Sequence, residues 1–410
     1  MSNIFSFSNL LQAYRHCRRH KRQKISAARF EICLERELLD LEKRLDSRAY
    51  RPKQYTCFAI TDPKLREVWA ADYSDRIVHH LLINYLEPIF APKFIFHSYA
   101  CRKNKGAHLA INHLRKIIAA QKPKFYLQID IQSFFTSLDK NILFSLVKKH
   151  IAHPDILWLA KLIIFSLPQD NCRISGDKKL IKSVPVHKSL FYSPPDKGLP
   201  IGNLTSQFFA NLYLNELDQY CKHILRIKHY FRYMDDIVVL HADDHQLFEW
   251  QKEIACFLVD RLKLKLHPQK IKLKKIASGL DFLGYIIKPS HILIRRRTVK
   301  KLKNKLWRFN RKIIAIYGHG NIGRAGDLIF HDPFLLMNDK TGLGAELKKI
   351  FSSLNSTFGA LKHADCYWLR RSLYQKHFGF LRLYLKPANR HYHYFIWNEP
   401  DAKLGQRGQT

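Results

Sequence analysis

The sequence predicts an α+β fold in which an antiparallel sheet packs against helices. Residues 125–131 form a strand in which polar and apolar residues alternate little, and residues 231–240 look like two strands joined by a tight turn. Residues 204–222 and 244–261 have the length and apolar spacing of helices. With 410 residues, 46% of them hydrophobic, the chain can form two or three subdomains and is too apolar for a disordered basic protein.

The remaining elements follow in chain order. Apolar residues three and four apart predict a helix from Phe30 to Leu45, and further helices are expected at 75–82 and 141–153. The polar stretch at 168–197 is expected to be a hairpin-bearing insertion, and strands are expected around 271–287. The predicted domains are a basic helical extension at 1–50, a main domain at 51–290, a basic helical domain at 291–390 and a tail at 391–410.

A composition shift marks the basic helical domain. Residues 298–313 predict an amphipathic helix with Thr298 as its N-cap. Its apolar stripe consists of Leu302, Leu306, Phe309 and Ile313. A loop at 318–344, a helix at 345–362 and an end rich in Tyr and Trp follow. The pair His391 and His393 is interpreted as part of a packed or stacking segment rather than a metal site.

Three aspartates carry the strongest chemical signal. Asp235 and Asp236 lie in the turn of the 231–240 hairpin, and Asp130 ends the strand at 125–131. Alone, Asp130 could be an ordinary strand-end residue, but adjacent carboxylates repel one another and favour a bound cation. Carboxylates from two neighbouring strands can hold two Mg²⁺ ions roughly 3.5–4 Å apart, with Mn²⁺ as a possible substitute. The pattern predicts a nucleic-acid polymerase, and its Tyr-Met-Asp-Asp sequence points to a reverse transcriptase.

The charge of the chain fits a nucleic-acid partner. Lys and Arg number 70 against 34 Asp and Glu, a formal net charge of +36, although charge alone cannot separate a polymerase from a ribosomal protein. The basic cluster at 16–24 either touches RNA or is a solvated arm. On the helix at 298–313, Lys301, Lys305 and Arg308 are expected to contact phosphates rather than only solvent.

The cellular compartment is expected to be the cytoplasm. Eight cysteines show neither a CxxC pair nor zinc spacing, which is typical of reduced thiols in a cytosolic protein. The first thirty residues have no signal-peptide core. The longest apolar stretch, 156–167, is interrupted by Lys161 and is too short to span a membrane, so no membrane association is expected.

Two further features suggest nucleotide contacts. Phe135 follows Asp130 by five residues, where a ring under the incoming sugar would clash with a 2′-hydroxyl; a core role for this ring is the alternative. The segment Gly198–Gln207 combines glycines, which allow close backbone approach, with Asn203, Thr205 and Ser206 at a helix start, where anions bind. A plain loop before a capped helix is the alternative for this segment.

These motifs together resemble the reverse transcriptases of diversity-generating retroelements. The resemblance covers about residues 50–300. It is carried by 99–106 (Tyr-Ala-Cys-Arg-Lys-Asn-Lys-Gly), 130–135, 188–191, 198–207, 233–236 and 282–285 (Phe-Leu-Gly-Tyr). Most reverse transcriptases have Gln-Gly and Ser-Pro where this chain has Ile201-Gly202 and Ser206-Gln207. The resemblance implies a right-hand fold, with fingers and palm at 51–290 and a helical thumb at 291–390.

The resemblance also implies roles for individual residues. Asp130, Asp235 and Asp236 match the metal-binding catalytic carboxylates, with the Ile131 carbonyl as a further ligand. Residues matching positions near the incoming dNTP are Lys64, Arg66, Phe135, Ile201, Gly202, Gln207 and Lys270. Lys270 would lie near the pyrophosphate, as a possible general acid or as plain surface charge. Residues matching nucleic-acid contacts are Arg102, Lys103, Lys105 and Tyr233, in addition to the basic helix.

The implied function is the copying of a template RNA into error-prone cDNA. Ile201 stands where accurate relatives keep a glutamine, which fits misincorporation opposite template adenine. Template RNA, cDNA, dNTPs and a small basic helical accessory protein are the implied partners, while the oligomeric state stays open. The alternatives are another bacterial reverse transcriptase, intron-like or defence-associated, and a catalytically silent RNA-binding scaffold.

Overall fold

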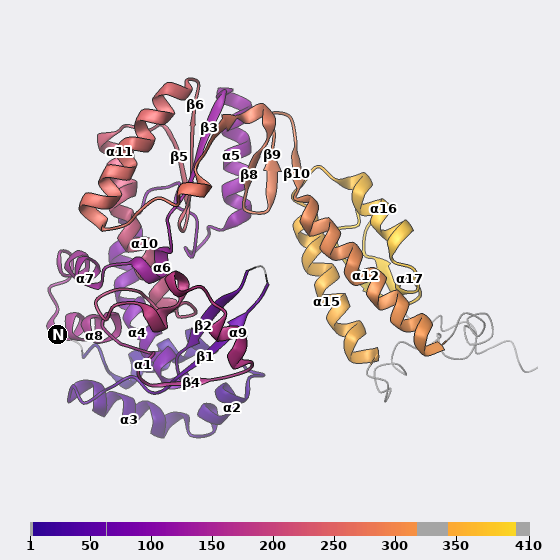
Figure 1. The fold of residues 1–410 in the computed structure, drawn as a ribbon. Coiled ribbons are helices and arrows are strands. Elements are labelled where there is room, and N and C mark those ends of the chain that lie inside the picture. Colours follow the sequence, from indigo (N-terminus) through magenta and orange to yellow (C-terminus); the bar gives the residue numbers. More distant parts are fainter. Residues whose placement is uncertain (1–2, 63, 318–342, 399–410) are drawn as a thin grey trace, which may run out of the picture. The chain divides into compact units, whose positions relative to one another are not determined.

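The computed structural model describes residues 3–62, 64–317 and 343–398 (Figure 1). The chain divides into two compact units. The first unit contains residues up to 110 together with 123–274, and the second contains 111–122 together with the residues from 275 onward. All residues expected at the catalytic centre belong to the first unit, and the basic helix of the sequence analysis belongs to the second.

Helices form the N-terminal part of the first unit. They are α1 (Phe7–Arg18), α2 (Ile25–Ile32), α3 (Leu34–Asp46) and α4 (Tyr73–Phe90). The single helix predicted from Phe30 to Leu45 is interrupted at Cys33, whose φ of −115° and ψ of 30° are not helical. The side chain of Asp72 caps α4 by accepting a hydrogen bond from the Ser74 amide at 3.0 Å. The helix predicted at 75–82 is therefore confirmed and is longer than expected.

A small sheet in the first unit has the order β2-β1-β4. Its strands are β1 (Tyr55–Ile60), β2 (Arg66–Ala70) and β4 (Cys172–Ile174). β1 pairs antiparallel with β2 and parallel with β4. The hairpin expected within 168–197 is not formed by the described residues there. The insertion instead adds β4 to this sheet and continues into the short helix α9 (Lys178–Lys182).

A four-stranded sheet carries the aspartates, in the order β5-β6-β3-β7. Its strands are β3 (Phe125–Asp130), β5 (His229–Tyr233), β6 (Asp236–His241) and β7 (Lys272–Lys275). β6 pairs antiparallel with both β3 and β5. The helices of this region are α6 (Phe134–Ser137), α7 (Lys140–Lys148), α8 (Pro154–Ile164), α10 (Leu204–Gln219) and α11 (Asp244–Leu262). α11 packs on β3 and β6, and α10 packs on α4, so apolar side chains of the sheet are buried.

The second unit is mainly helical. Its helices are α12 (Arg296–Tyr317), α15 (Leu343–Leu361), α16 (Tyr367–His377), α17 (Leu381–Tyr384) and most of α5 (Ala107–Gln121). Its short strands are β8 (Leu280–Phe282), β9 (Tyr285–Ile287), β10 (Ile292–Ile294), β11 (Leu385–Pro387) and β12 (Phe395–Trp397). The predicted apolar stripe of α12 is confirmed, because its four residues are buried. Thr298 was a wrong N-cap prediction, because α12 begins two residues earlier. The loop expected at 318–344 lies almost entirely outside the described residues.

The α+β class with antiparallel sheets is thus confirmed. Among the described residues, no helix combines the length and the apolar composition that crossing a membrane would need. The eight cysteines are free thiols, as their spacing predicted.

Candidate active site

The three aspartates meet at one end of the four-stranded sheet. β3 and β6 run antiparallel in a register that pairs Asp130 with Asp236, and β5 and β6 pair Tyr233 with Asp236. Only Met234 and Asp235 connect β5 to β6. The sheet therefore brings together carboxylates from two distant parts of the sequence, as the sequence analysis expected.

The turn that carries two of these carboxylates has an unusual backbone. Met234 has φ = 57°, in the left-handed region that residues with a side chain seldom adopt. Such a conformation costs of order 1 kcal/mol or more and persists only where the surroundings enforce it. Next to the turn, Gln128 Nε2 donates a hydrogen bond of 3.1 Å to Asp236 Oδ1 and so restrains that carboxylate.

Electrostatics at the turn are governed by burial and by like charges. Burial raises the pKa of Asp235, and the neighbouring carboxylate of Asp130 raises it further. Lys270 and Arg66 act in the opposite direction and lower that pKa. Both cations were expected near the triphosphate, and both are close enough to influence Asp235. The site thus combines crowded carboxylates with cations suited to phosphate groups.

Lys270 reaches the site through an irregular strand pairing. The main chain of Ile131 bridges antiparallel to Leu266, and the His267 amide donates to the Asp130 carbonyl at 2.8 Å. This pairing brings Lys270 Nζ to 2.6 Å from Asp130 Oδ1. Lys270 is therefore a residue of the site and not an isolated surface charge.

The segment 198–202 connects Phe135 to strand β2. The Leu199 amide donates to the Phe135 carbonyl, and the Trp69 amide donates to the Ile201 carbonyl, each at 2.7 Å. Gly202 has φ = +121°, and a Cβ there would lie 2.8 Å from Val68 Cγ1. Both the backbone conformation and the close approach require glycine at this position. The Phe135 ring is half-buried, whereas its neighbour Phe134 is buried in the core.

The polar residues at the start of α10 do not serve as predicted. Asn203, Thr205 and Ser206 are all buried, at 4%, 2% and 2% exposure, and of the three Asn203 lines a cavity. Asn203 Oδ1 accepts a hydrogen bond from the Ala71 amide at 3.3 Å. Through this bond Asn203 joins the start of α10 to the residue that follows β2.

Gly202 and Gln207 line two adjoining cavities of about 360 and 380 Å³. Both cavities include His80 and Leu204. The basic side chains at their walls are Arg19, Lys21, Arg76 and Lys103, and His16 lies beside them. Residues of the basic cluster at 16–24 therefore face the 198–207 segment across open space.

The cations expected to bind nucleic acid in the first unit differ in their surroundings. Arg102 donates to the carbonyls of Ile95 at 2.7 Å and Ser98 at 3.0 Å, and it is close to the Phe94 ring. Lys105 donates to the Phe96 carbonyl at 2.9 Å. These contacts favour a structural role for Arg102 and Lys105. By contrast, Lys103 is exposed and lines a cavity, while Tyr233 is half-buried.

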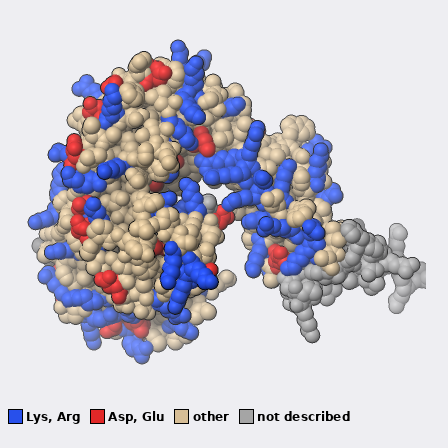
Figure 2. Space-filling view, in the orientation of Figure 1, with Lys and Arg blue, Asp and Glu red and all other residues tan. Residues whose placement is uncertain are grey.

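The basic residues of α12 lie on the surface of the second unit. Lys301, Lys305 and Arg308 are exposed, and Lys305 Nζ donates to Ser353 Oγ at 2.9 Å. Figure 2 shows Lys and Arg side chains gathered on the visible face of this unit, over α12. Lys64, in the first unit, is likewise exposed.

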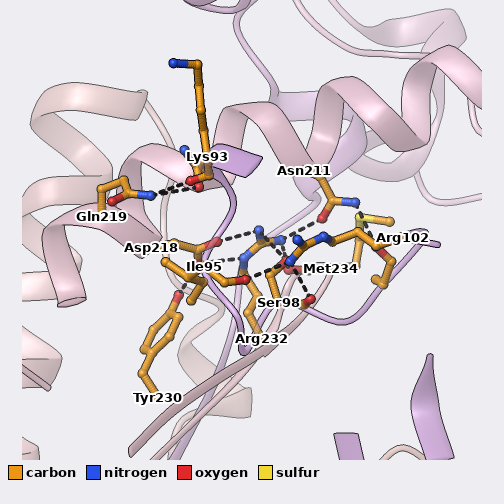
Figure 3. A network of polar contacts seen from close by, with 12 residues as sticks. Lys93, Ile95, Ser98, Arg102, Asn211, Asp218, Gln219, Tyr230, Arg232 and Met234 are labelled. Atoms are coloured by element: carbon orange, nitrogen blue, oxygen red, sulfur yellow. Dashed lines mark hydrogen bonds and ion pairs between the residues drawn. The ribbon is translucent and has the colours of Figure 1, made fainter. Parts of the chain in front are cut away.

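Sequence reasoning missed a buried polar network behind the turn, centred on Arg232 and Asp218 (Figure 3). Two signals could have revealed it. Arg232 stands among apolar residues in a strand that must be buried, and a charge there needs a partner. Asn211 and Asp218 are seven residues apart, so they share one face of α10.

The donor chemistry of the site suits Mg²⁺, which prefers hard carboxylate oxygens. Repulsion from the Asp130 carboxylate contributes to the raised pKa of Asp235, and a bound cation would relieve this repulsion. Within the described ranges, however, no three acidic, His or Cys side chains already form a metal-binding cluster, and Lys270 contacts Asp130. Substrate phosphates would have to complete the coordination, as is usual for Mg²⁺.

A palm-like antiparallel sheet with carboxylates at a hairpin and an adjoining strand end defines a class of nucleotide-polymerising proteins. Comparison with known families gives the same class. Residues 61–287 match the model of the family described as reverse transcriptase (RNA-dependent DNA polymerase). The chain therefore belongs to the reverse transcriptase family, and the predicted enzyme class and polymerase fold class are confirmed at that level.

Individual relatives are distant. The chain is 25% identical to protein YkfC of Escherichia coli over 289 residues, which cover 61% of this chain and 67% of YkfC. It is 21% identical over 305 residues to the group II intron-encoded protein LtrA of Lactococcus lactis, covering 59% of this chain but 48% of LtrA. A solved telomerase from Candida albicans, in complex with a fragment of telomeric RNA, has a TM-score of 0.40 at 12% identity, covering 80% of this chain and 58% of the telomerase.

Proposed function

We propose that this protein copies a template RNA into cDNA by two-metal-ion nucleotidyl transfer. The observation that carries the proposal is the register that pairs Asp130 with Asp236 beside Asp235, with Lys270 against Asp130. Three carboxylates at one end of a sheet repel one another, which is energetically costly without a bound cation. Membership in the reverse transcriptase family supports the choice of RNA as template and DNA as product.

Asp130, Asp235 and Asp236 would hold the two ions, with the Ile131 carbonyl as a further ligand. Bound Mg²⁺, or Mn²⁺ in its place, would activate the 3′-hydroxyl and neutralise charge on the phosphates. Lys270 and Arg66 would bind the triphosphate, together with Lys64, and Lys270 would be in position to protonate the pyrophosphate. Since Lys270 Nζ contacts Asp130 at 2.6 Å, it would have to move by some ångströms when substrate binds.

Sugar and base selection would fall to residues near the 198–202 segment. Phe135 is half-buried and its carbonyl is hydrogen-bonded to Leu199, which supports a fixed ring that excludes a 2′-hydroxyl. Ile201, Gly202 and Gln207 would line the pocket that receives the incoming nucleotide. The backbone of Ile201 is attached to β2, so its apolar side chain would be a fixed feature of that pocket.

We infer that the biological setting is a diversity-generating retroelement, with errors concentrated at template adenine. The residues that support this are Ile201 and Gln207, which depart from the Gln-Gly and Ser-Pro of most reverse transcriptases. A small basic helical accessory protein and a cytoplasmic location belong to the same proposal. The boundaries of fingers, palm and thumb at 51–290 and 291–390 are proposed on the same basis.

A second candidate is another bacterial reverse transcriptase of the intron-like kind. It is supported by similarity to LtrA, an intron-encoded protein, although the chain spans about half of LtrA. The two settings share the same chemistry and differ in the error spectrum of the cDNA. A catalytically silent scaffold is disfavoured, because such a protein would be expected to lose at least one of the three carboxylates.

The test is primer extension on a defined RNA template. Asp235→Asn and Asp130→Asn should each abolish nucleotide addition and leave RNA binding nearly unchanged, since a ligand is lost while the fold is kept. EDTA should stop the wild-type reaction, and added Mg²⁺ should restore it. Asp243→Asn is the matched control, because this exposed carboxylate only caps α11 through the His245 amide. Extension above trace level by the Asp235→Asn, Asp236→Asn double variant would show that the assignment is wrong.

A further inference from the structure

A fully buried ion pair lies behind the turn that carries Asp235. Arg232 of β5 and Asp218 of α10 both have 0% side-chain exposure. Arg232 Nε donates to Asp218 Oδ1 at 2.7 Å, and Nη2 donates to Oδ2 at 2.6 Å, so the two groups form a two-pronged contact (Figure 3). Burying two charges is expensive and is seldom the most stable solution for a core. The pair therefore calls for an explanation beyond stability.

The remaining donors of Arg232 are also satisfied. Nη1 donates to Asn211 Oδ1 at 3.1 Å and to the Met234 carbonyl at 3.3 Å, while Nη2 also donates to Ser98 Oγ at 3.1 Å. All five N–H groups of the guanidinium thus have acceptors: three on α10, one in the turn and one at Ser98. A lysine has three donors on one nitrogen and cannot reproduce this planar arrangement.

One of these acceptors belongs to the strained turn itself. Met234 has φ = 57° and directly precedes Asp235. The main chain of Arg232 is held as well: its amide donates to the His97 carbonyl at 2.9 Å, and its carbonyl accepts from the Tyr99 amide at 3.0 Å. Arg232 is thus anchored to the 97–99 segment through its backbone and to α10 through its side chain, and it holds the turn between them.

We propose that Arg232 and Asp218 are positioning residues, which fix the Met234 carbonyl and thereby aim the Asp235 carboxylate toward Asp130. The proposal rests on the proposed function, since it assumes that Asp235 and Asp130 act together. Neither Arg232 nor Asp218 touches substrate. Asp218 neutralises and orients the guanidinium, and the guanidinium holds the turn in a conformation that Met234 would otherwise avoid.

A purely structural role for the pair makes a different prediction. A core ion pair that only stabilises the fold would lower the unfolding temperature when altered, with catalysis by the folded fraction unchanged. A positioning pair would change the reaction of folded protein. A misplacement of a catalytic group by about 1 Å can cost about 100-fold in rate.

The experiment compares Arg232→Lys with wild type in single-nucleotide addition at a temperature where both are folded. We expect kcat to fall by about 10- to 100-fold and the Mg²⁺ concentration for half-maximal rate to rise. The KM for dNTP should change less than about threefold, because the proposed triphosphate cations Lys64 and Arg66 are untouched. This separation of kcat from KM, together with the shift in Mg²⁺ dependence, is not expected from lost stability.

Arg370→Lys is the matched control. Arg370 is also a nearly buried arginine, at 5% exposure, and it donates to the carbonyls of Leu361 at 2.8 Å and His391 at 2.9 Å within the second unit. The unfolding temperature of Arg370→Lys should fall as it does for Arg232→Lys. Its kcat and its Mg²⁺ dependence should stay within about twofold of wild type. Equal kcat losses in both variants would mean that general destabilisation explains the effect and would overturn the proposal.

Two further outcomes keep the test decisive. If Arg232→Lys does not fold, Asp218→Asn replaces it, since this change removes the negative charge that pairs with the guanidinium and orients it. A fall in kcat of about 3- to 10-fold is then expected, and unchanged kcat would overturn the proposal. Wild-type protein that adds no nucleotide would refute the proposed function itself, whereas active wild type with an equally active Arg232→Lys variant would refute only the positioning role.

Discussion

The basic face of α12 provides a quantitative test of nucleic-acid binding. Lys301, Lys305 and Arg308 are four and three residues apart, so they lie on one side of the helix. Each immediately precedes a residue of the buried stripe, and all three are exposed. The perturbation is replacement of all three by Gln, which removes their charge and keeps much of their size.

The expected magnitude follows from the number of contacts. Each phosphate that a cation neutralises contributes about 0.9 to the slope of log affinity against log salt, so three contacts contribute about 2.7. Between 50 and 200 mM salt, wild type should lose about 40-fold more affinity than the triple variant. The loss should be the same on templates of different sequence, because phosphate contacts carry no sequence information.

The assay is binding of a fluorescent RNA–DNA primer–template at a series of salt concentrations. A triple Gln variant of Lys348, Lys349 and Lys362 serves as the control, because these lysines are exposed at or beside α15 of the same unit. Its slope should fall by much less than that of the α12 variant. An unchanged slope for the α12 variant, or equal changes in both variants, would refute the reasoning and leave the α12 face as a solvated surface.

Three other predictions concern the first unit. Ile201→Gln should restore a polar contact beside the nascent base pair and lower misincorporation at template adenine by about 3- to 10-fold. The measurement is sequencing of cDNA made from a fixed RNA. A wild-type error rate equal at all four template bases would contradict the retroelement assignment. Phe135→Ala should raise incorporation of ribonucleotides by about tenfold in primer extension. Unchanged incorporation would mean that the Phe135 ring only packs in the core. Burial raises the pKa of Asp75 from 3.8 to about 6, against hydrogen bonds from Tyr50 and Lys53 that lower it, so the folded state holds this proton more tightly than the unfolded state. The free energy of unfolding of wild type relative to Asp75→Asn should therefore fall by about 2 to 2.5 kcal/mol as pH rises from 4 to 7, and a constant difference in urea titrations would contradict this.

Local pattern predicted the parts of the site that depend on local structure. The strand ending at Asp130 and the hairpin carrying Asp235 have strong sequence signals, and strand pairing then brings the carboxylates together. The apolar stripe of α12 is likewise a property of one helix. The position of Lys270 was reached only through resemblance, because its contact with Asp130 depends on an irregular pairing between residues far apart in the sequence.

The errors concern a helix end and two contacts with distant parts of the chain. Thr298 had suitable chemistry for a cap, but α12 begins two residues before it, and helix ends are the part of a helix that local pattern defines least well. The polar start of α10 looked like a ligand-binding surface, but those side chains are buried, and Asn203 accepts its hydrogen bond from Ala71, far away in the sequence. The 168–197 segment suggested a local hairpin, whereas β4 pairs in parallel with β1 more than a hundred residues away in sequence. For Asn203 and for β4 the partner is far away in the sequence, so the pattern around the residue could not reveal it.

The same reasoning connects the buried ion pair to the catalytic turn. A turn bearing adjacent carboxylates is unfavourable in two ways, since Met234 has a left-handed backbone and Asp235 is repelled by Asp130. Local sequence supplies no glycine to relieve the first cost and no adjacent cation to relieve the second. The compensation comes from elsewhere in the fold: Arg232 holds the Met234 carbonyl, while Lys270 and Arg66 offset the negative charge. Because Asp218 balances the charge of Arg232, the guanidinium can hold the backbone without adding a net charge beside the aspartates that are proposed to bind metal. We therefore expect Lys270 and Arg66 to interact with phosphates, whereas Arg232 would act mainly through its hold on the backbone of the turn.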